Sequence, residues 1–199
     1  MTDAPGIRLF VAVPLGELLR AELADAVADL RAASHTNGEW RWMEPADWHV
    51  TLAFIGWVEP GAPSGLAAAL SSSVAGHAPF WVDTGGLGAF PGHARARVLW
   101  YGVADPDGRL ADLAWAAGTA TGAAQDRDRQ LHAHVTLARS RDRRGTAPDP
   151  TWSDARLPAG RLDVDRVILY RSRVDRVPVR YEALAEAPLA AVVRPVAAT

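Results

Sequence analysis

Apolar and polar residues alternate along several stretches of the chain, and helical patterns separate these stretches. Residues 7–13 place Leu9, Val11 and Val13 on one face, which is typical of a strand with one buried side. Residues 15–33 instead carry apolar side chains on one helical stripe, which indicates an amphipathic helix. The same criteria predict strands at residues 39–43, 48–55, 97–103, 132–139, 162–174 and 179–187, helices at residues 60–76 and 105–124, and extended chain near residues 80–82 and Leu87.

The order of the predicted elements repeats, because a strand, a helix and a second strand occur in each half of the chain. The glycine-rich segment 85–92 is the predicted crossover, which places the boundary between the halves within residues 85–97. We therefore expect an α+β protein that forms one domain over residues 1–199, with two similar lobes joined across a groove. The charged, Pro- and Gly-rich segment 140–154 is predicted to be a mobile surface loop.

The composition excludes several kinds of chemistry. All 21 basic residues are arginine, so no lysine can form a Schiff base. The chain has no cysteine, which excludes disulfides, thiol nucleophiles and cysteine-ligated zinc. The net charge of −2 gives no overall attraction to polyanions. No signal peptide is visible and no apolar run approaches the roughly 20 residues that span a bilayer, so we expect a cytoplasmic protein without membrane contact, acting as a monomer.

One five-residue segment, His-Val-Thr-Leu-Ala, occurs twice in the chain, beginning at His49 and again at His134. In a strand, side chains at positions i and i+2 share one face, so each histidine lies beside its threonine, Thr51 or Thr136. The valine and leucine of each copy then point to the other face, toward a core. Two such strands facing one groove would place two imidazoles and two hydroxyls around one small polar group.

This arrangement suits acid–base chemistry at a phosphate. An imidazole can accept or donate a proton near neutral pH, so one histidine can activate a nucleophile while the other protonates the leaving oxygen. Threonine hydroxyls and an arginine can bind the non-bridging oxygens. Opening a cyclic phosphodiester with water needs only these groups, without a metal or a covalent intermediate. The residues alone assign neither proton-transfer role to either histidine.

Two other interpretations fit parts of the pattern. A single His-x-Thr on a strand is usually a packing feature, although five identical residues in two matching contexts are harder to explain by packing. A metal is the second alternative, since His132 and His134 share a strand face and His49 could be a third ligand. Neither copy has an acidic residue at a matching place, and the chain lacks an H-E-x-x-H signature, a P-loop and a G-x-S-x-G elbow.

The two His-x-Thr segments resemble those of the two-histidine phosphoesterases. Flanking segments are similar to the bacterial and archaeal RNA 2′,3′-cyclic phosphodiesterases, historically called 2′-5′ RNA ligases. The resemblance rests on residues 8–14, 49–52, 96–100, 134–137, 169–172 and 181–182. It implies two lobes, each with an antiparallel sheet and outer helices, and an active site in the groove between them.

The resemblance also implies an activity, which is hydrolysis of RNA 2′,3′-cyclic phosphate ends, or of small nucleotide cyclic phosphates, to 2′-phosphates without metal or cofactor. His49 would donate a proton to the leaving 3′ oxygen and His134 would accept one from water. Thr51 and Thr136 would bind the phosphate. Related possibilities are a two-histidine phosphodiesterase or ligase acting on 2′-5′ linked or other cyclic phosphate substrates, and a non-catalytic RNA-end binding module. The intact His and Thr in both copies favour an enzyme.

Four further residues are candidates for substrate binding. Arg139 matches a family arginine proposed to contact the phosphate, and Phe10 is a candidate for stacking on a base. His132 stands where the family often has a Phe-x-Pro segment, so it would be an added groove residue. Strict alternation places Phe54 and Arg139 opposite the histidines, so their contacts require a strand end or a bulge before them. Three arginines in the loop that follows, at positions 141, 143 and 144, would either be solvated or contact an RNA backbone.

Overall fold

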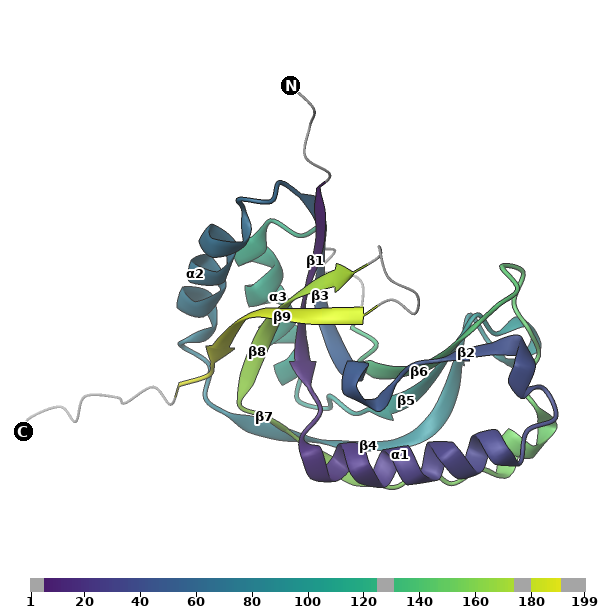
Figure 1. Cartoon of the computed structure of the whole chain (residues 1–199). Coiled ribbons are helices and arrows are strands. Elements are labelled where there is room, and N and C mark those ends of the chain that lie inside the picture. The colour runs from purple at the N-terminus through teal and green to yellow at the C-terminus, as the bar shows by residue number, and fades with distance from the viewer. Residues whose placement is uncertain (1–5, 125–130, 174–179, 191–199) are drawn as a thin grey trace, which may run out of the picture.

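A computed structural model describes residues 6–124, 131–173 and 180–190 of the chain. Its strands form one antiparallel sheet in the order β7-β4-β5-β6-β3-β1-β8-β9, with β2 paired to β6 (Figure 1). The α+β class is thereby confirmed. Among the described residues, no helix combines the length and apolarity needed to cross a membrane. The strands are β1 (Ile7–Pro14), β2 (Trp40–Trp42), β3 (His49–Val58), β4 (Phe80–Phe90), β5 (Val98–Val103), β6 (His134–Ser140), β7 (Gly160–Val164), β8 (Arg166–Arg173) and β9 (Arg180–Pro188), and the helices are α1 (Glu17–Ala32), α2 (Pro63–Val74) and α3 (Arg109–Thr121).

The sheet has two groups of strands that meet at its centre. The two His-Thr strands, β3 and β6, are the innermost strand of each group, and they are joined through the pair Val50 and Val135. Strands β1, β8 and β9 extend the sheet on the side of β3, whereas β5, β4 and β7 extend it on the side of β6. The repeated segments therefore lie side by side, which agrees with the expected arrangement of two lobes joined across a groove.

Helices α1 and α3 each pack against the other group of strands from the one that precedes them in the chain. Helix α1 follows β1 in the chain but packs against β7, where the side chain of Leu19 lies close to Gly160. Helix α3 connects β5 to β6 but packs against β3 and α2; Figure 1 shows α2 and α3 together on the left, away from α1 at the bottom. Strand β8, from the second half of the sequence, pairs with β1, so neither lobe is a continuous half of the sequence.

The glycine-rich segment 85–92, expected to be the crossover, lies largely within strand β4. Gly88 has a packing role there, because the indole of Trp100 on β5 lies directly against it. A Cβ at Gly88 would lie 2.1 Å from the Trp100 ring. Gly86 adopts a φ of 76° at an irregularity in the pairing with β5. A glycine cluster more often marks a turn than a strand, so the pairing of this segment with β5 and β7 is not evident from its composition.

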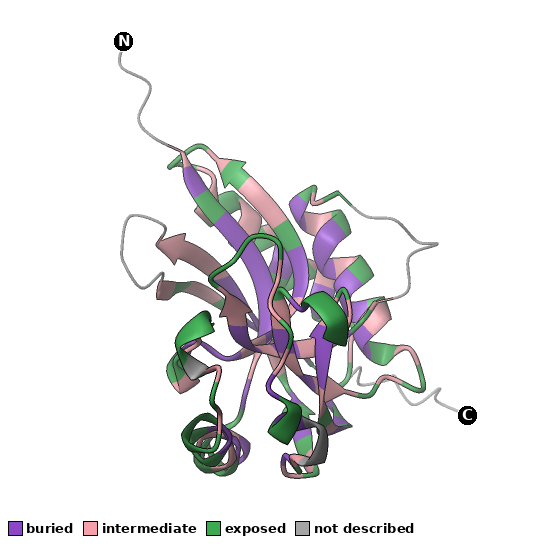
Figure 2. Cartoon of the chain, turned by 90° about the vertical axis from the view of Figure 1, so that its right-hand side faces the viewer, coloured by how far each residue is buried: buried purple, intermediate pink, exposed green. Residues whose placement is uncertain are grey.

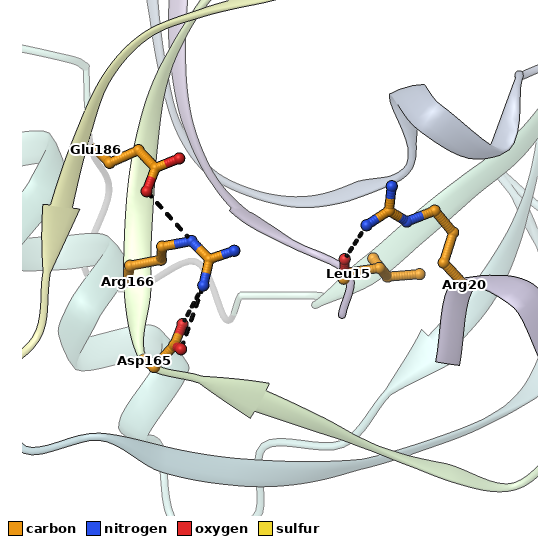
Figure 3. A network of polar contacts seen from close by, with 5 residues as sticks. All are labelled: Leu15, Arg20, Asp165, Arg166 and Glu186. Carbon is orange, nitrogen blue, oxygen red and sulfur yellow. Dashed lines mark hydrogen bonds and ion pairs between the residues drawn. The ribbon is translucent and has the colours of Figure 1, made fainter. Parts of the chain in front are cut away.

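Apolar side chains fill the space between the sheet and its helices. Leu23 of α1, Leu113 of α3 and Val50 of β3 are all fully buried in this core. Figure 2 shows buried residues running along the strands, while the helices present exposed residues outward. At the rim of the sheet, Arg166 on β8 lies 3.5 Å from Glu186 on β9 and 3.0 Å from Asp165 (Figure 3). These ion pairs are solvent-exposed and contribute little to stability.

The segment 140–154, expected to be a mobile loop, is attached to the body of the protein. Asp149 is 3% exposed, and its carboxylate accepts hydrogen bonds from the backbone N–H groups of His35 at 2.6 Å and Thr36 at 3.2 Å. Thr151 donates to the same carboxylate, and these donors hold the pKa of Asp149 well below its usual range. Trp152 is also buried, and its indole N–H donates to the carbonyl of Leu30. The expectation rested on composition, which could not anticipate these long-range contacts.

Candidate active site

The two histidines of the repeated segment line one cavity of about 1330 Å³. Val50 of β3 pairs with Val135 of β6, and each valine directly follows one of the histidines. The sheet pairing itself therefore brings the two imidazoles to the same cavity. Thr51 and Thr136 line this cavity as well. The structure thus brings together all four residues of the two His-x-Thr pairs.

Both imidazoles are held in the same way by the backbone. Nδ1 of His49 lies 2.7 Å from the carbonyl oxygen of Asp47, and Nδ1 of His134 lies 2.7 Å from the carbonyl oxygen of His132. A carbonyl oxygen can only accept, so Nδ1 carries the hydrogen in each ring. Nε2 is then the nitrogen that can exchange a proton with a substrate, in both copies.

The surroundings of the histidines favour their neutral forms. Burial lowers the pKa of His49 to about 4, although the carbonyl and the carboxylate of Asp47 act in the opposite direction. Burial also lowers the pKa of His134, against the effect of its hydrogen bond to His132. The positive charge of Arg139 lowers both pKa values further. An anionic phosphate in the cavity would raise both, because it favours the charged imidazolium.

A β-bulge brings Phe54 to the histidine face of β3. The pairing with β1 runs from Thr51 directly to Ala53, so Leu52 is the extra residue. Leu52 and Ala53 are consequently both buried, and Phe54 returns to the side of His49. Phe54 lines the cavity and is 64% exposed. The bulge resolves the conflict between strict alternation and the expected place of this side chain.

Strand β6 has the same irregularity at the matching position. Its pairing with β5 runs from Thr136 to Ala138 and skips Leu137. Leu137 and Ala138 are both fully buried, and Arg139 lines the cavity with His134. The two copies of the repeated segment therefore share a bulge as well as a sequence. This bulge places an aromatic ring in one copy and a guanidinium in the other beside the histidines.

Phe10 is more enclosed than a residue that stacks on a base would be. It is 4% exposed, and its ring centroid lies 4.9 Å from that of His49. The ring of Tyr170 stacks on Phe10 at 5.2 Å, and Tyr181 contacts it edge-on at 5.0 Å. Because these rings already cover Phe10, it supports His49 from below and does not offer a free face to a base. Phe54, by contrast, lines the cavity with an exposed ring.

Two contacts around His49 were missed in the sequence. The ring of Tyr181, on β9, meets the imidazole edge-on at 5.0 Å and lines the cavity. The carboxylate of Asp47, 8% exposed, accepts hydrogen bonds from Arg180 at 3.1 Å and from the backbone N–H of Tyr181 at 3.4 Å. These bonds attach β9 to the short turn before His49. No local pattern connects residues so far apart in the chain, although Tyr181 belongs to a segment already singled out by resemblance.

His132 lies at the cavity beside the second histidine. It is exposed, and its ring meets the edges of Phe90 at 4.9 Å and Trp100 at 5.0 Å. The ring of His134 also lies 5.1 Å from Phe90. His132 thus forms part of an aromatic wall, and its contact with a substrate stays a prediction.

The positive charges at the cavity come from three different strands. Arg8 on β1, Arg41 on β2 and Arg139 on β6 line it. The arginines at positions 141, 143 and 144 are exposed in the loop after β6, outside the set of cavity-lining residues. Within the described part of the chain, no group of three His, Asp or Glu side chains is placed to hold a metal ion.

Comparison with known proteins identifies the family. The sequence model of the 2′-5′ RNA ligase superfamily matches residues 19–176. An RNA 2′,3′-cyclic phosphodiesterase from Geobacillus stearothermophilus is 32% identical over 186 residues, which are 90% of this chain and 56% of that protein. One from Archaeoglobus fulgidus is 30% identical over 67% of this chain and 72% of its own. The chain thus spans little more than half the length of the first of these relatives.

Solved structures show the same fold. The protein TT0787 of Thermus thermophilus is 26% identical, with a TM-score of 0.72 over 92% of this chain and 97% of that one. Escherichia coli LigT in its apo form is 23% identical, with a TM-score of 0.69 over 94% of this chain and 100% of its own. The family expected from the two His-x-Thr segments is confirmed. The chain belongs to the 2′-5′ RNA ligase superfamily.

Proposed function

We propose that this protein is an RNA 2′,3′-cyclic phosphodiesterase that opens a cyclic phosphate end to a 2′-phosphate without a metal. The observation that carries the proposal is the pair of identically oriented imidazoles, His49 and His134, facing one cavity. Each has Nε2 available for proton transfer, and each has a threonine hydroxyl and the guanidinium of Arg139 nearby. The relatives named as RNA 2′,3′-cyclic phosphodiesterases support this choice of substrate.

The charges around the two rings support different roles for them. Burial dominates at His49 and lowers its pKa, but the carboxylate of Asp47 acts in the opposite direction and would favour an imidazolium once a phosphate is bound. Burial lowers the pKa of His134, and no carboxylate of the described residues acts on it in the opposite direction, which favours a neutral base there. In the proposed step, water attacks phosphorus and gives a proton to His134. The bond from phosphorus to O3′ breaks, and O3′ takes a proton from His49.

The direct test is incubation with an oligonucleotide that ends in a 2′,3′-cyclic phosphate, with and without a chelator. We expect conversion to the 2′-phosphate at the same rate in both samples, resolved from the 3′-phosphate by chromatography. A 3′-phosphate product would reverse the assignment of donor and acceptor. Activity that is lost to the chelator and restored by zinc would support the metal alternative, and tight binding without turnover would support an RNA-end binding module.

The dependence of activity on pH gives a second test. Catalysis needs one protonated and one neutral histidine, and in the free protein both pKa values lie below the ordinary 6.5. The pH dependence of kcat/KM reports the pKa values of the free enzyme, so the optimum of kcat/KM is expected below pH 6.5. Above the optimum, kcat/KM is expected to decline because the histidine that must donate a proton becomes neutral. The bound phosphate anion favours the imidazolium, so the profile of kcat is expected at higher pH. A value of kcat/KM that rises steadily from pH 6 to pH 9 would contradict this scheme.

A further inference from the structure

Two large aromatic side chains of strand β3 are exposed beside the active site. Phe54 is 64% exposed and Trp57 is 63% exposed. Side chains of this size are mostly buried in a folded protein, so an exposed pair on one strand suggests a binding surface. The strand that carries the pair also carries His49.

Strand pairing places both rings on the catalytic face of the sheet. Residues directly opposite each other in an antiparallel pair share a face. Phe54 lies opposite Phe10, whose ring contacts His49, and the two phenylalanine centroids are 6.4 Å apart. Trp57 lies opposite Arg8, which is two residues before Phe10 on β1 and so shares its face.

A second bulge in β3 makes this alignment possible. The pairing runs from Phe10 and Phe54 directly to Leu9 and Gly56, so Ile55 is the extra residue. Gly56 has a φ of 88°, a left-handed conformation that favours glycine. The bulge returns the next residue, Trp57, to the face of Phe54 although three positions separate the two.

These residues form a track that leads away from the two histidines. Arg8 lies on β1 opposite Trp57, about 7 Å along the strand from Phe10, and it lines the cavity. Along the surface, the ring of Phe54 is thus followed by the ring of Trp57 and, beside it on β1, the guanidinium of Arg8. We refer to Phe54, Arg8 and Trp57 as the β3 track.

We propose that the β3 track binds the nucleotides that precede the cyclic phosphate end of an RNA chain. Phe54 and Trp57 stack on successive bases, and Arg8, beside Trp57, contacts a phosphate of the same segment. Stacking accepts any base, since every base has a π face, and an arginine fork matches phosphate oxygens. The preferred substrate is therefore the end of an oligonucleotide rather than a mononucleotide cyclic phosphate. This inference rests on the proposed function, whose substrate it specifies.

Substrates of increasing length test the track. We would measure kcat/KM for a mono-, a di- and a trinucleotide, each ending in a 2′,3′-cyclic phosphate. In the wild type, kcat/KM is expected to rise with length, and in Trp57→Ala the ratio between trinucleotide and mononucleotide is expected to fall about fivefold to a hundredfold. Trp57→Phe keeps a stacking ring and should retain most of the ratio. The matched control is Trp81→Ala, since Trp81 is 51% exposed on β4 and packs against Arg161, outside the cavity lining.

The possible results separate the track from the proposed function. Equal rates for all three lengths, unchanged in Trp57→Ala, would overturn the track while the hydrolase assignment stands. If no substrate is hydrolysed, the proposed function fails, and fluorescence anisotropy of a labelled trinucleotide still tests the track, with weaker binding to Trp57→Ala as the supporting result. Equal binding to wild type and variant would overturn it. A smaller sedimenting mass for Trp57→Ala, without any effect of substrate length, would instead assign this surface to a second copy of the chain.

Discussion

Replacing either His49 or His134 with alanine is expected to lower kcat for hydrolysis of a cyclic phosphate end by about 10²- to 10⁴-fold. In the proposed mechanism, each change removes one of the two groups that move protons on opposite sides of the phosphorus. The loss in the double variant should be much smaller than the product of the two single losses, because the two groups act as a unit. Single-turnover rates with a 2′,3′-cyclic-phosphate oligonucleotide would measure the chemical step directly.

The controls for this prediction distinguish catalysis from folding. His49 packs against Phe10 and Tyr181, so His49→Gln, which preserves more of the side-chain volume than alanine, should show the same loss with a thermal unfolding midpoint close to that of the wild type. His93→Ala replaces an exposed histidine outside the cavity lining and should keep full activity. Wild-type activity in either single variant of the pair would mean that the two histidines do not form one site.

The His-x-Thr pairs could be predicted because their signal is local. The side-chain period of a strand puts His49 beside Thr51 on one face, and the same holds for His134 and Thr136. The exact repeat of five residues then links the two strands without any knowledge of their pairing. The structure adds the reason for their convergence, which is the pairing of Val50 with Val135.

The local pattern does not reveal the bulges at Leu52 and Leu137. Alternation correctly predicts residues up to the threonines and then fails by one position, so it sends Phe54 and Arg139 to the wrong face. Nothing in two consecutive apolar residues distinguishes a bulge from a regular strand that is buried on both sides. Only the register with β1 and β5 shows which residue is extra.

Contacts between distant segments lay beyond sequence reasoning altogether. Asp47 precedes the first His-x-Thr pair by two residues, yet its carboxylate is held by Arg180 and by the backbone of Tyr181 on the last strand. The packing of α1 and α3 against the other lobe could not be predicted either. An amphipathic stripe shows that a helix packs on a sheet, but it does not show against which strands. The anchoring of Asp149 to His35 and Thr36 is a third example.

The loss of Arg139 has the second largest expected effect. Arg139→Ala removes the guanidinium that faces both histidines, so kcat/KM for the cyclic phosphate should fall by about 10²- to 10³-fold. The same change removes a positive charge that lowers the pKa of His49 and of His134. Both pKa values should therefore rise, and the optimum of kcat/KM should move to higher pH than in the wild type. Histidine NMR titrations of the free protein would measure this rise independently of activity.

Arg139→Lys separates the charge from the geometry of the guanidinium. A lysine keeps the positive charge but loses the planar fork that binds two phosphate oxygens, so the pH profile should stay near that of the wild type while kcat/KM recovers only in part. Arg156→Ala, at an exposed arginine outside the cavity lining, should change neither quantity. If Arg139→Ala lowers kcat/KM without moving the histidine pKa values, Arg139 binds the substrate but does not control the protonation of the pair. If it changes neither, the bulge in β6 places this side chain beside the histidines without a role in the reaction.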